Sequence, residues 1–130
     1  MSAAGFDRVT PTVVIRLHPK ITHAAFEGRI IDLAHLFGWR AHAERPALRQ
    51  SGKWSTPIRG DAGWPDLVLV HPRSGLLIVA ELKIPPDKVT AAQQEWLDAL
   101  TIPGIQVHVW RPVDWPAIVE IVSFGRAVIA

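Results

Sequence analysis

Apolar and polar residues follow one another along this chain in blocks that predict a mixed α/β fold. Residues 22–37 (THAAFEGRIIDLAHLF) repeat apolar side chains at about 3.6 residues, the period of a helix with one buried face. Thr22 suits the start of this helix and Gly38 its end. The same reading predicts strands at 39–43, 66–71, 76–82 and 105–110, a further candidate strand at 12–19, and helices at 91–100 and 115–122. The predicted order is α-β-β-β-α-β-α.

The two helices in the second half of the chain have recognisable start signals. Thr90 and Gln93 fit a capping box that opens the helix at 91–100. Asp114 is expected to cap the last helix, with Val113 and Ile118 packed together as a hydrophobic staple.

Residues 66–71 and 76–82 are joined by PRSG and predict a β-hairpin. With a four-residue loop His71 lies opposite Leu76, and counting outward places Asp66 opposite Glu81. Alternation then puts Lys83 on the same face as both carboxylates. Because both faces of the hairpin are otherwise mostly apolar, we expect it at the centre of a sheet covered by helices on both faces.

Two carboxylates opposite each other on a hairpin have β-carbons about 4.5–5.5 Å apart, where like charges repel. A divalent cation relieves that repulsion, and Mg²⁺ is commonly held by one or two carboxylates together with water and phosphate oxygens. Lys83 would then orient an attacking water or stabilise charge on a phosphate. The alternative is structural: Glu81 and Lys83 are edge charges paired with neighbours, and Asp66 caps the start of its strand.

Composition narrows the choice of protein class. A length of 130 residues with 48% hydrophobic and 20% charged residues fits one folded domain. The absence of cysteine excludes disulfides, a thiolate zinc site and a cysteine nucleophile, and is compatible with a cytoplasmic location. The net charge of +2 permits a polyanionic partner without requiring one. With no apolar run near the roughly 20 residues of a membrane span and no signal-peptide pattern, we expect a soluble protein.

Residues 44–63 form a long stretch without periodicity, which in a compact domain is usually functional or disordered. Since Lys and Arg contacts to phosphate dominate affinity for nucleic acids, its basic residues are candidate DNA contacts, with an ordinary solvated loop as the alternative. These candidates are Arg45, Arg49, Lys53 and Arg59.

Pro65-Asp66 is followed after fourteen residues by Glu81-Leu82-Lys83, which resembles the signature of the PD-(D/E)xK nucleases. The surrounding sequence resembles the VRR-NUC branch of these enzymes. The resembling segments are GWPDLVLV, VAELK, TAAQQEWLDAL and VHVWRPVDWPAIVEIV, together with IIDLAHLFGWRAH, which is similar to the first helix and strand of the family. They occur in the family's order and span about residues 22–122. A single short motif would be weak evidence for the family, whereas five similar segments in the family's order are specific evidence.

The resemblance implies a restriction-endonuclease-like α/β core, with a central mixed sheet flanked by helices, in one nuclease domain over residues 1–130 of which 1–21 are an N-terminal extension. It also implies hydrolysis of DNA phosphodiesters with Mg²⁺ or Mn²⁺. Small stand-alone members resemble phage-type Holliday-junction resolvases, so the implied partners are branched DNA and a second copy of the chain.

Carried over by position, the resemblance implies that Asp66 and Glu81 bind the metal and that Lys83 positions the nucleophile. Gln93 matches the family's active-site glutamine, although the capping box with Thr90 explains the same residue.

The first helix departs from the family pattern. Where the family has a glutamate near the start of this helix, this chain has His23, and another often acidic position is Ala25. Glu27 lies one turn after His23 on the same face, and we expect it to replace the missing acid as a metal ligand. His23 is the competing candidate, and Glu27 as a solvated residue is the third reading. If neither completes the site, activity is reduced or lost, and the protein is a DNA-binding or assembly module of the same fold. A separate alternative is a nuclease that acts on other DNA substrates.

A few further side chains are individual candidates for the site. Asp61 is near enough in sequence to join the acidic site, although aspartate is common in turns. The six histidines lack metal-ligand spacing: His71 and His108 are expected at strand ends, and His42 is a candidate near the site. Trp64 is a candidate substrate contact, whereas Trp96, Trp110 and Trp115 suit core or dimer packing.

Overall fold

The computed structural model describes residues 17–18, 20–44, 47–48, 52, 54–55 and 58–128. Its elements, in chain order, are α2 (His23–Leu36), β1 (Arg40–Ala43), β2 (Ala47–Leu48), β3 (Trp54–Ser55), β4 (Leu67–His71), β5 (Leu76–Leu82), α3 (Ala91–Leu100), β6 (Gln106–Trp110), the 3-10 helix η1 (Pro112–Asp114) and α4 (Trp115–Val128). The candidate strand at 12–19 lies almost entirely outside the described residues. Apart from the short strands β2 and β3, the order is the α-β-β-β-α-β-α order that the sequence predicts.

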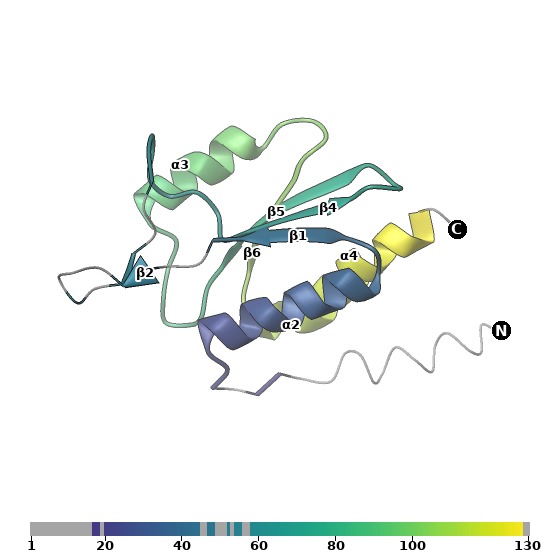
Figure 1. Ribbon diagram of the computed structural model, residues 1–130, viewed down its shortest axis with the longest axis horizontal. Helices are drawn as coiled ribbons and strands as arrows, with labels where there is room; N and C mark the ends of the chain where they lie inside the picture. Colours follow the sequence, from purple (N-terminus) through teal and green to yellow (C-terminus); the bar gives the residue numbers. More distant parts are fainter. Residues whose placement is uncertain are drawn as a thin grey trace.

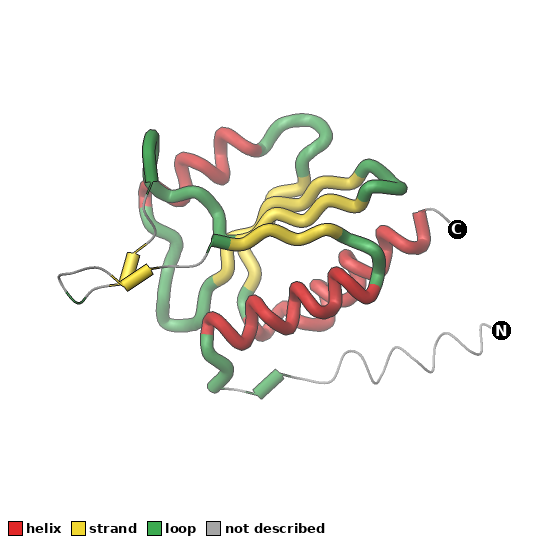
Figure 2. Tube along the Cα trace, viewed as in Figure 1, coloured by secondary structure: helices red, strands yellow, loops and turns green. Residues whose placement is uncertain are grey.

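The main sheet is mixed, as predicted, and has the strand order β1-β4-β5-β6 (Figure 2). Strand β4 is antiparallel to both of its neighbours, β1 and β5, whereas β5 and β6 are parallel. Parallel neighbours need a crossover, and α3 lies in that connection. The hairpin strands β4 and β5 therefore occupy the two central positions.

The register of the β4–β5 hairpin is the one obtained by counting. His71 lies opposite Leu76 and Leu67 opposite Ala80. The loop closes with the backbone N–H of Gly75 donating to the carbonyl of His71 at 2.8 Å. Asp66 comes one residue before β4, so the same register continued by one step brings it level with Glu81.

The hydrophobic core lies between one face of the sheet and the helices α2 and α4, while α3 lies against the other face (Figure 1). On the core face Leu67, Leu69 and Ile78 are fully buried. On the α3 face Val79 is 2% exposed but Val70 is 38% exposed. The prediction of helices on both faces is confirmed, with the second face only partly covered.

The helix start signals at Thr22 and Thr90 are confirmed. The Thr22 side chain accepts a hydrogen bond from the backbone N–H of Ala25, and Thr90 and Gln93 form the capping box. At the end of α2, Gly38 adopts φ +88°, a left-handed conformation that glycine tolerates.

Two sequence-based expectations are wrong. The stretch 44–63 contains the two-stranded antiparallel sheet β2–β3, whose strands of two residues are too short to produce a visible alternation. The staple between Val113 and Ile118 does not form, since Val113 is 81% exposed while Ile118 is fully buried. The reason is η1, in which the Asp114 carboxylate accepts from the backbone N–H of Arg111 at 2.8 Å and closes a 3-10 turn ahead of α4.

Among the described residues, no helix is long and apolar enough to cross a bilayer.

Candidate active site

A cleft of about 1000 Å³ opens where α2, the loop before β4 and the first turn of α3 meet. Its polar lining comes from segments far apart in the sequence: His23 and Glu27 of α2, Glu44 after β1, Asp66 before β4, and Gln93 of α3. Trp64 and Ile58 add an apolar part of the wall. The cleft thus gathers three of the five predicted catalytic residues, namely Glu27, Asp66 and Gln93.

Asp66 is fixed at the entrance to β4 by two contacts to the same oxygen. Its Oδ2 accepts a hydrogen bond from the backbone N–H of Leu82 at 2.9 Å, and His23 Nε2 lies 3.3 Å from it. Burial by itself raises the pKa of Asp66, but the hydrogen bonds from His23 and from Leu82 outweigh it and leave that pKa below its usual value. The Asp66 carboxylate is therefore ionised at neutral pH.

Glu81 is 2% exposed and lies beside Asp66 and Lys83. Its Oε2 is 3.1 Å from Lys83 Nζ, whereas the buried Oε1 makes no hydrogen bond to any described residue. Burial and the charge of Asp66 raise the pKa of Glu81 to about 7, against the opposing effect of Lys83. Two neighbouring carboxyl groups with pKa values moved in opposite directions are typical of catalytic sites.

The donor set fits a hard divalent cation with few protein ligands. An ionised carboxylate at Asp66 and a buried oxygen on Glu81 without a partner among the described residues offer the oxygen ligands that Mg²⁺ and Mn²⁺ prefer. Mg²⁺ needs only one or two carboxylates. Within the described part of the chain, no group of three or more His, Asp or Glu side chains is placed to hold a metal. The three-carboxylate set of Asp66, Glu81 and Glu27 therefore stays a prediction.

Gln93 forms the predicted capping box and also lines the cleft, while its role as an active-site glutamine stays a prediction. Its Oε1 accepts from the backbone N–H of Thr90 at 2.9 Å in the capping box, and the residue also lines the cleft. Gly63 brings this helix start close to Asp66. At φ +101° its Cα approaches α3 so closely that an added β-carbon would lie 2.5 Å from the carbonyl oxygen of Ala92.

The first helix presents His23 and Glu27 to the same cleft, and His23 Nε2 lies 3.3 Å from Asp66 Oδ2. The hydrogen bond to Asp66 is the largest cause that raises the pKa of His23, and the charge of Glu27 adds to it. Glu27 thus lines the cleft beside His23, and its negative charge favours the protonated imidazole.

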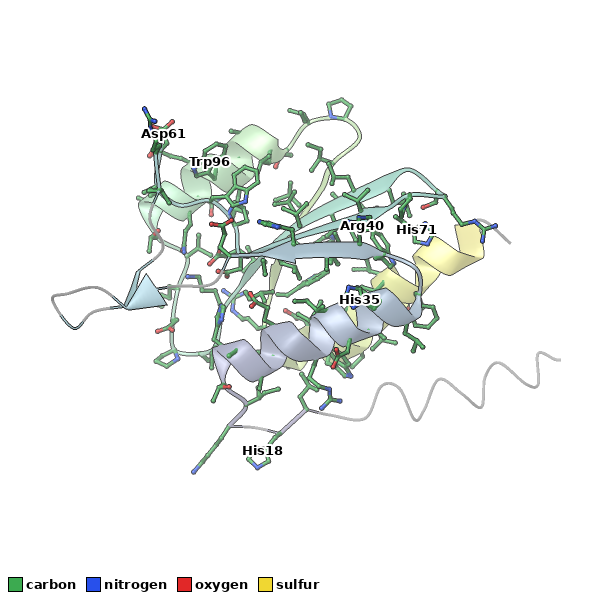
Figure 3. All side chains as sticks on the ribbon, in the orientation of Figure 1. His18, His35, Arg40, Asp61, His71 and Trp96 are labelled. Atoms are coloured by element: carbon green, nitrogen blue, oxygen red, sulfur yellow. The ribbon has the colours of Figure 1, made fainter. Side chains whose placement is uncertain are left out.

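Other sequence candidates lie elsewhere or outside the described residues. Arg45, Arg49 and Lys53 are not described, and Arg59 is exposed. Asp61 does not line the cleft; its carbonyl accepts from Trp96 Nε1 at 3.2 Å, beside a neighbouring cavity of about 600 Å³ (Figure 3). His42 Nε2 pairs with Glu44 Oε2 at 3.0 Å.

The histidines considered for strand ends differ in their surroundings. His71 is 1% exposed, and its Nε2 lies 3.0 Å from the carbonyl of Phe37. It is at the end of the sheet away from Trp96 (Figure 3). His108 stacks on Trp110 inside β6, and burial lowers its pKa. Neither belongs to the cleft.

The sequence reasoning missed three contributors: Glu44, Gly63 and the backbone N–H of Leu82. The sequence does contain a signal for Gly63, because a glycine just before WPD suggests a close approach of the backbone to another segment. In the antiparallel pair of β1 and β4, His42 lies opposite Val68. Glu44, two residues after His42, therefore lies level with Asp66, two residues before Val68. That pairing is not encoded in any local pattern.

A comparison with protein-family models matches the VRR-NUC domain over residues 49–114, just over half of the chain. The matched region contains Asp66, Glu81, Lys83 and Gln93 but not the first helix. No curated protein and no solved structure gives a significant match.

Replacing Gly63 should disturb the site through the backbone. Gly63→Ala forces a side chain into a positive φ and against Ala92, so we expect the free energy of unfolding to fall by about 1–3 kcal/mol. Urea denaturation measures this. Gly28→Ala is the matched control: nothing lies within 4 Å of its added β-carbon, and in mid-helix the change should raise stability by up to about 1 kcal/mol. Equal effects of the two substitutions would contradict the close approach.

Glu81→Gln should remove a pH dependence of stability. The unfolded chain ionises this glutamate near 4.5, whereas the folded pKa is about 7, so between these values only the folded protein keeps the proton. The stabilisation is therefore present below about pH 4.5 and lost as the pH rises through about 7, on the order of 3 kcal/mol in all. Urea unfolding at about pH 5 and about pH 8 should show that the free energy of unfolding of Glu81→Gln, relative to that of wild type, is larger at the higher pH.

Glu95→Gln, at an exposed position of α3, is the control and should show the same difference from wild type at both pH values. A Glu81→Gln effect that is independent of pH would contradict the raised pKa.

Proposed function

This chain belongs to the VRR-NUC domain family, and from that membership we propose that it is a divalent-metal-dependent endonuclease that hydrolyses phosphodiester bonds in branched DNA. VRR-NUC domains are nucleases of the PD-(D/E)xK type, so a nuclease acting on DNA is the activity that the family supports. The metal, the endonucleolytic cut and the preference for branched DNA, including Holliday junctions, are the finer parts of the proposal.

The observation that carries the proposal is the charge arrangement at the open end of the hairpin. Asp66 and Glu81 are neighbouring carboxyl groups, and the buried Oε1 of Glu81 has no hydrogen-bond partner among the described residues. Burying a polar atom without a partner costs free energy. Such a cost is retained at functional sites when a ligand satisfies the atom during the reaction.

Each residue of the motif has a task in the proposed hydrolysis, in which water adds to phosphorus and one P–O bond breaks. Asp66 and Glu81 would hold Mg²⁺ or Mn²⁺, which when bound lowers the pKa of water and neutralises phosphate charge. The Lys83 ammonium holds Oε2 of Glu81 at 3.1 Å, and its charge would orient the water and stabilise the phosphate as charge develops. The backbone N–H of Leu82 keeps Asp66 in position.

The remaining assignments extend the proposal to the walls of the cleft. Gln93 would contact the phosphate or the attacking water from the start of α3, and Glu27 would complete the metal site directly or through water. Basic residues of the stretch 44–63 would contact the DNA backbone, and of these Arg59 is exposed in the structure. Resemblance to small junction resolvases supports a single-domain enzyme that acts as a homodimer.

A second candidate function is a DNA-binding module of the same fold with impaired catalysis. It is favoured by the first helix, where His23 stands at the position at which the family has a glutamate. It differs from the first in that DNA is bound but not cut.

Replacing Asp66 or Lys83, the first and last residues of the PD-(D/E)xK motif, should abolish cleavage. We expect nicking of a labelled four-way junction with Mg²⁺ or Mn²⁺, loss of activity on chelation, and a fall of about 10²–10³-fold or more in Asp66→Ala and Lys83→Ala. Gel electrophoresis of products measures the rate, and Lys88→Ala, an exposed lysine outside the cleft, should keep it. Wild type that cuts no junction, flap, single strand or duplex with either metal would refute the nuclease proposal, and retained DNA binding would then support the second candidate.

The contribution of the first helix is tested with neutral variants. If Glu27 holds the ion, Glu27→Gln should weaken Mn²⁺ binding about tenfold, measured by calorimetry, with His23→Gln nearly unchanged. The opposite ranking would assign the position to His23, and equal small effects would leave Asp66 and Glu81 as the protein ligands.

A further inference from the structure

The cleft contains an exposed tryptophan beside the candidate catalytic carboxylate. Trp64 is 42% exposed and comes two residues before Asp66, and Ile58, 57% exposed, lines the same cleft. Large apolar side chains exposed together in a concavity usually mark a binding site. The metal chemistry of the motif does not use either residue, so their exposure needs another explanation.

The Trp64 ring is held in place before any ligand arrives. It packs edge-to-face on Trp96, with centroids 4.9 Å apart and an interplanar angle of 84°. Trp96 is in turn fixed by donating from Nε1 to the carbonyl of Asp61 at 3.2 Å. Gly63, directly before Trp64, is pressed against the backbone of Ala92. A rigid aromatic ring loses little entropy on binding, which suits a stacking platform.

We propose that Trp64 stacks against a nucleobase that is unstacked from its neighbours at the nucleotide next to the cleaved phosphate. This inference rests on the proposed DNA hydrolysis and names the feature of the substrate that the cleft reads. In an intact duplex the faces of each base are covered by the adjacent pairs, so only an unpaired or extruded nucleotide offers a face to Trp64. Because every base has a π-face, the selection is for local DNA structure and not for sequence.

The apolar lining is consistent with a base and not with backbone alone. Phosphates would be recognised by cationic or N–H donors, whereas Trp64, Ile58 and Ile31 offer no charge to this part of the cleft. The carboxylate of Glu44 also lines it and disfavours a second phosphate there. The site therefore combines one position for the phosphate, at Asp66, with an adjacent apolar position for a ring.

The experiment measures binding without metal, so it does not depend on cleavage. Two short duplexes are compared in EDTA, one fully paired and one with a single unpaired 2-aminopurine nucleotide. We expect wild type to prefer the second and to quench its 2-aminopurine emission. Trp64→Ala should lower the affinity for this duplex about tenfold, with little change for the paired duplex, and Trp64→Phe should retain most of the preference.

Controls separate stacking from other effects of the substitution. Ile102→Ala removes a side chain that is 53% exposed outside the cleft and should leave both affinities unchanged. Replacing the unpaired base by an abasic site should remove the difference between wild type and Trp64→Ala. The quenching by wild type stands as evidence even if Trp64→Ala proves unstable.

Four results would overturn the inference. Equal affinity of wild type for the two duplexes, or equal weakening of both by Trp64→Ala, would exclude base stacking while leaving the nuclease proposal in place. A Trp64→Ala variant that changes only the monomer–dimer equilibrium would assign the residue to a subunit contact. Wild type that binds neither duplex in EDTA would also overturn the inference, whereas the nuclease proposal is decided separately by the cleavage assay with Mg²⁺ or Mn²⁺.

Discussion

The repulsion between two carboxyl groups at the open end of one hairpin is the constraint around which this structure is arranged. Asp66 and Glu81 are neighbours with little solvent to screen them, and the fold compensates on one side only. Hydrogen bonds from His23 and the Leu82 backbone stabilise the charge on Asp66. Glu81 contacts Lys83 through one oxygen, while its other oxygen has no hydrogen-bond partner in the described part of the chain. A protein selected only for stability would replace such a pair, so the pair points to a requirement set by a ligand.

The rest of the fold supplies rigid supports for this arrangement. The central position of β4 and β5 keeps the hairpin fixed, and the core formed with α2 and α4 holds its other face. Helix α3 reaches the site through an approach that only glycine permits at position 63. Three separately anchored segments therefore converge on Asp66, which explains how so few polar side chains can be positioned accurately.

The sequence predicts the parts of this site that depend on local rules. Loop length and alternation place Asp66 opposite Glu81, and cap patterns locate the starts of α2 and α3. It fails where the outcome depends on contacts between distant segments. The position of Glu44 requires the pairing of β1 with β4, and the outward turn of Val113 requires the 3-10 geometry before α4. Which residue of the first helix serves the site also depends on how α2 docks against the sheet.

The hairpin register has a consequence for how much length variation this type of motif can accept. Residues added within the loop at 72–75 leave every strand pair in register, so the gap between the two carboxylates can grow there without moving either one. A single residue inserted within β4 or β5 would shift one carboxylate to the opposite face of the sheet, into the hydrophobic core. Families built on this hairpin can therefore vary in motif spacing through their turns, whereas the strands themselves tolerate changes only in steps that preserve the face.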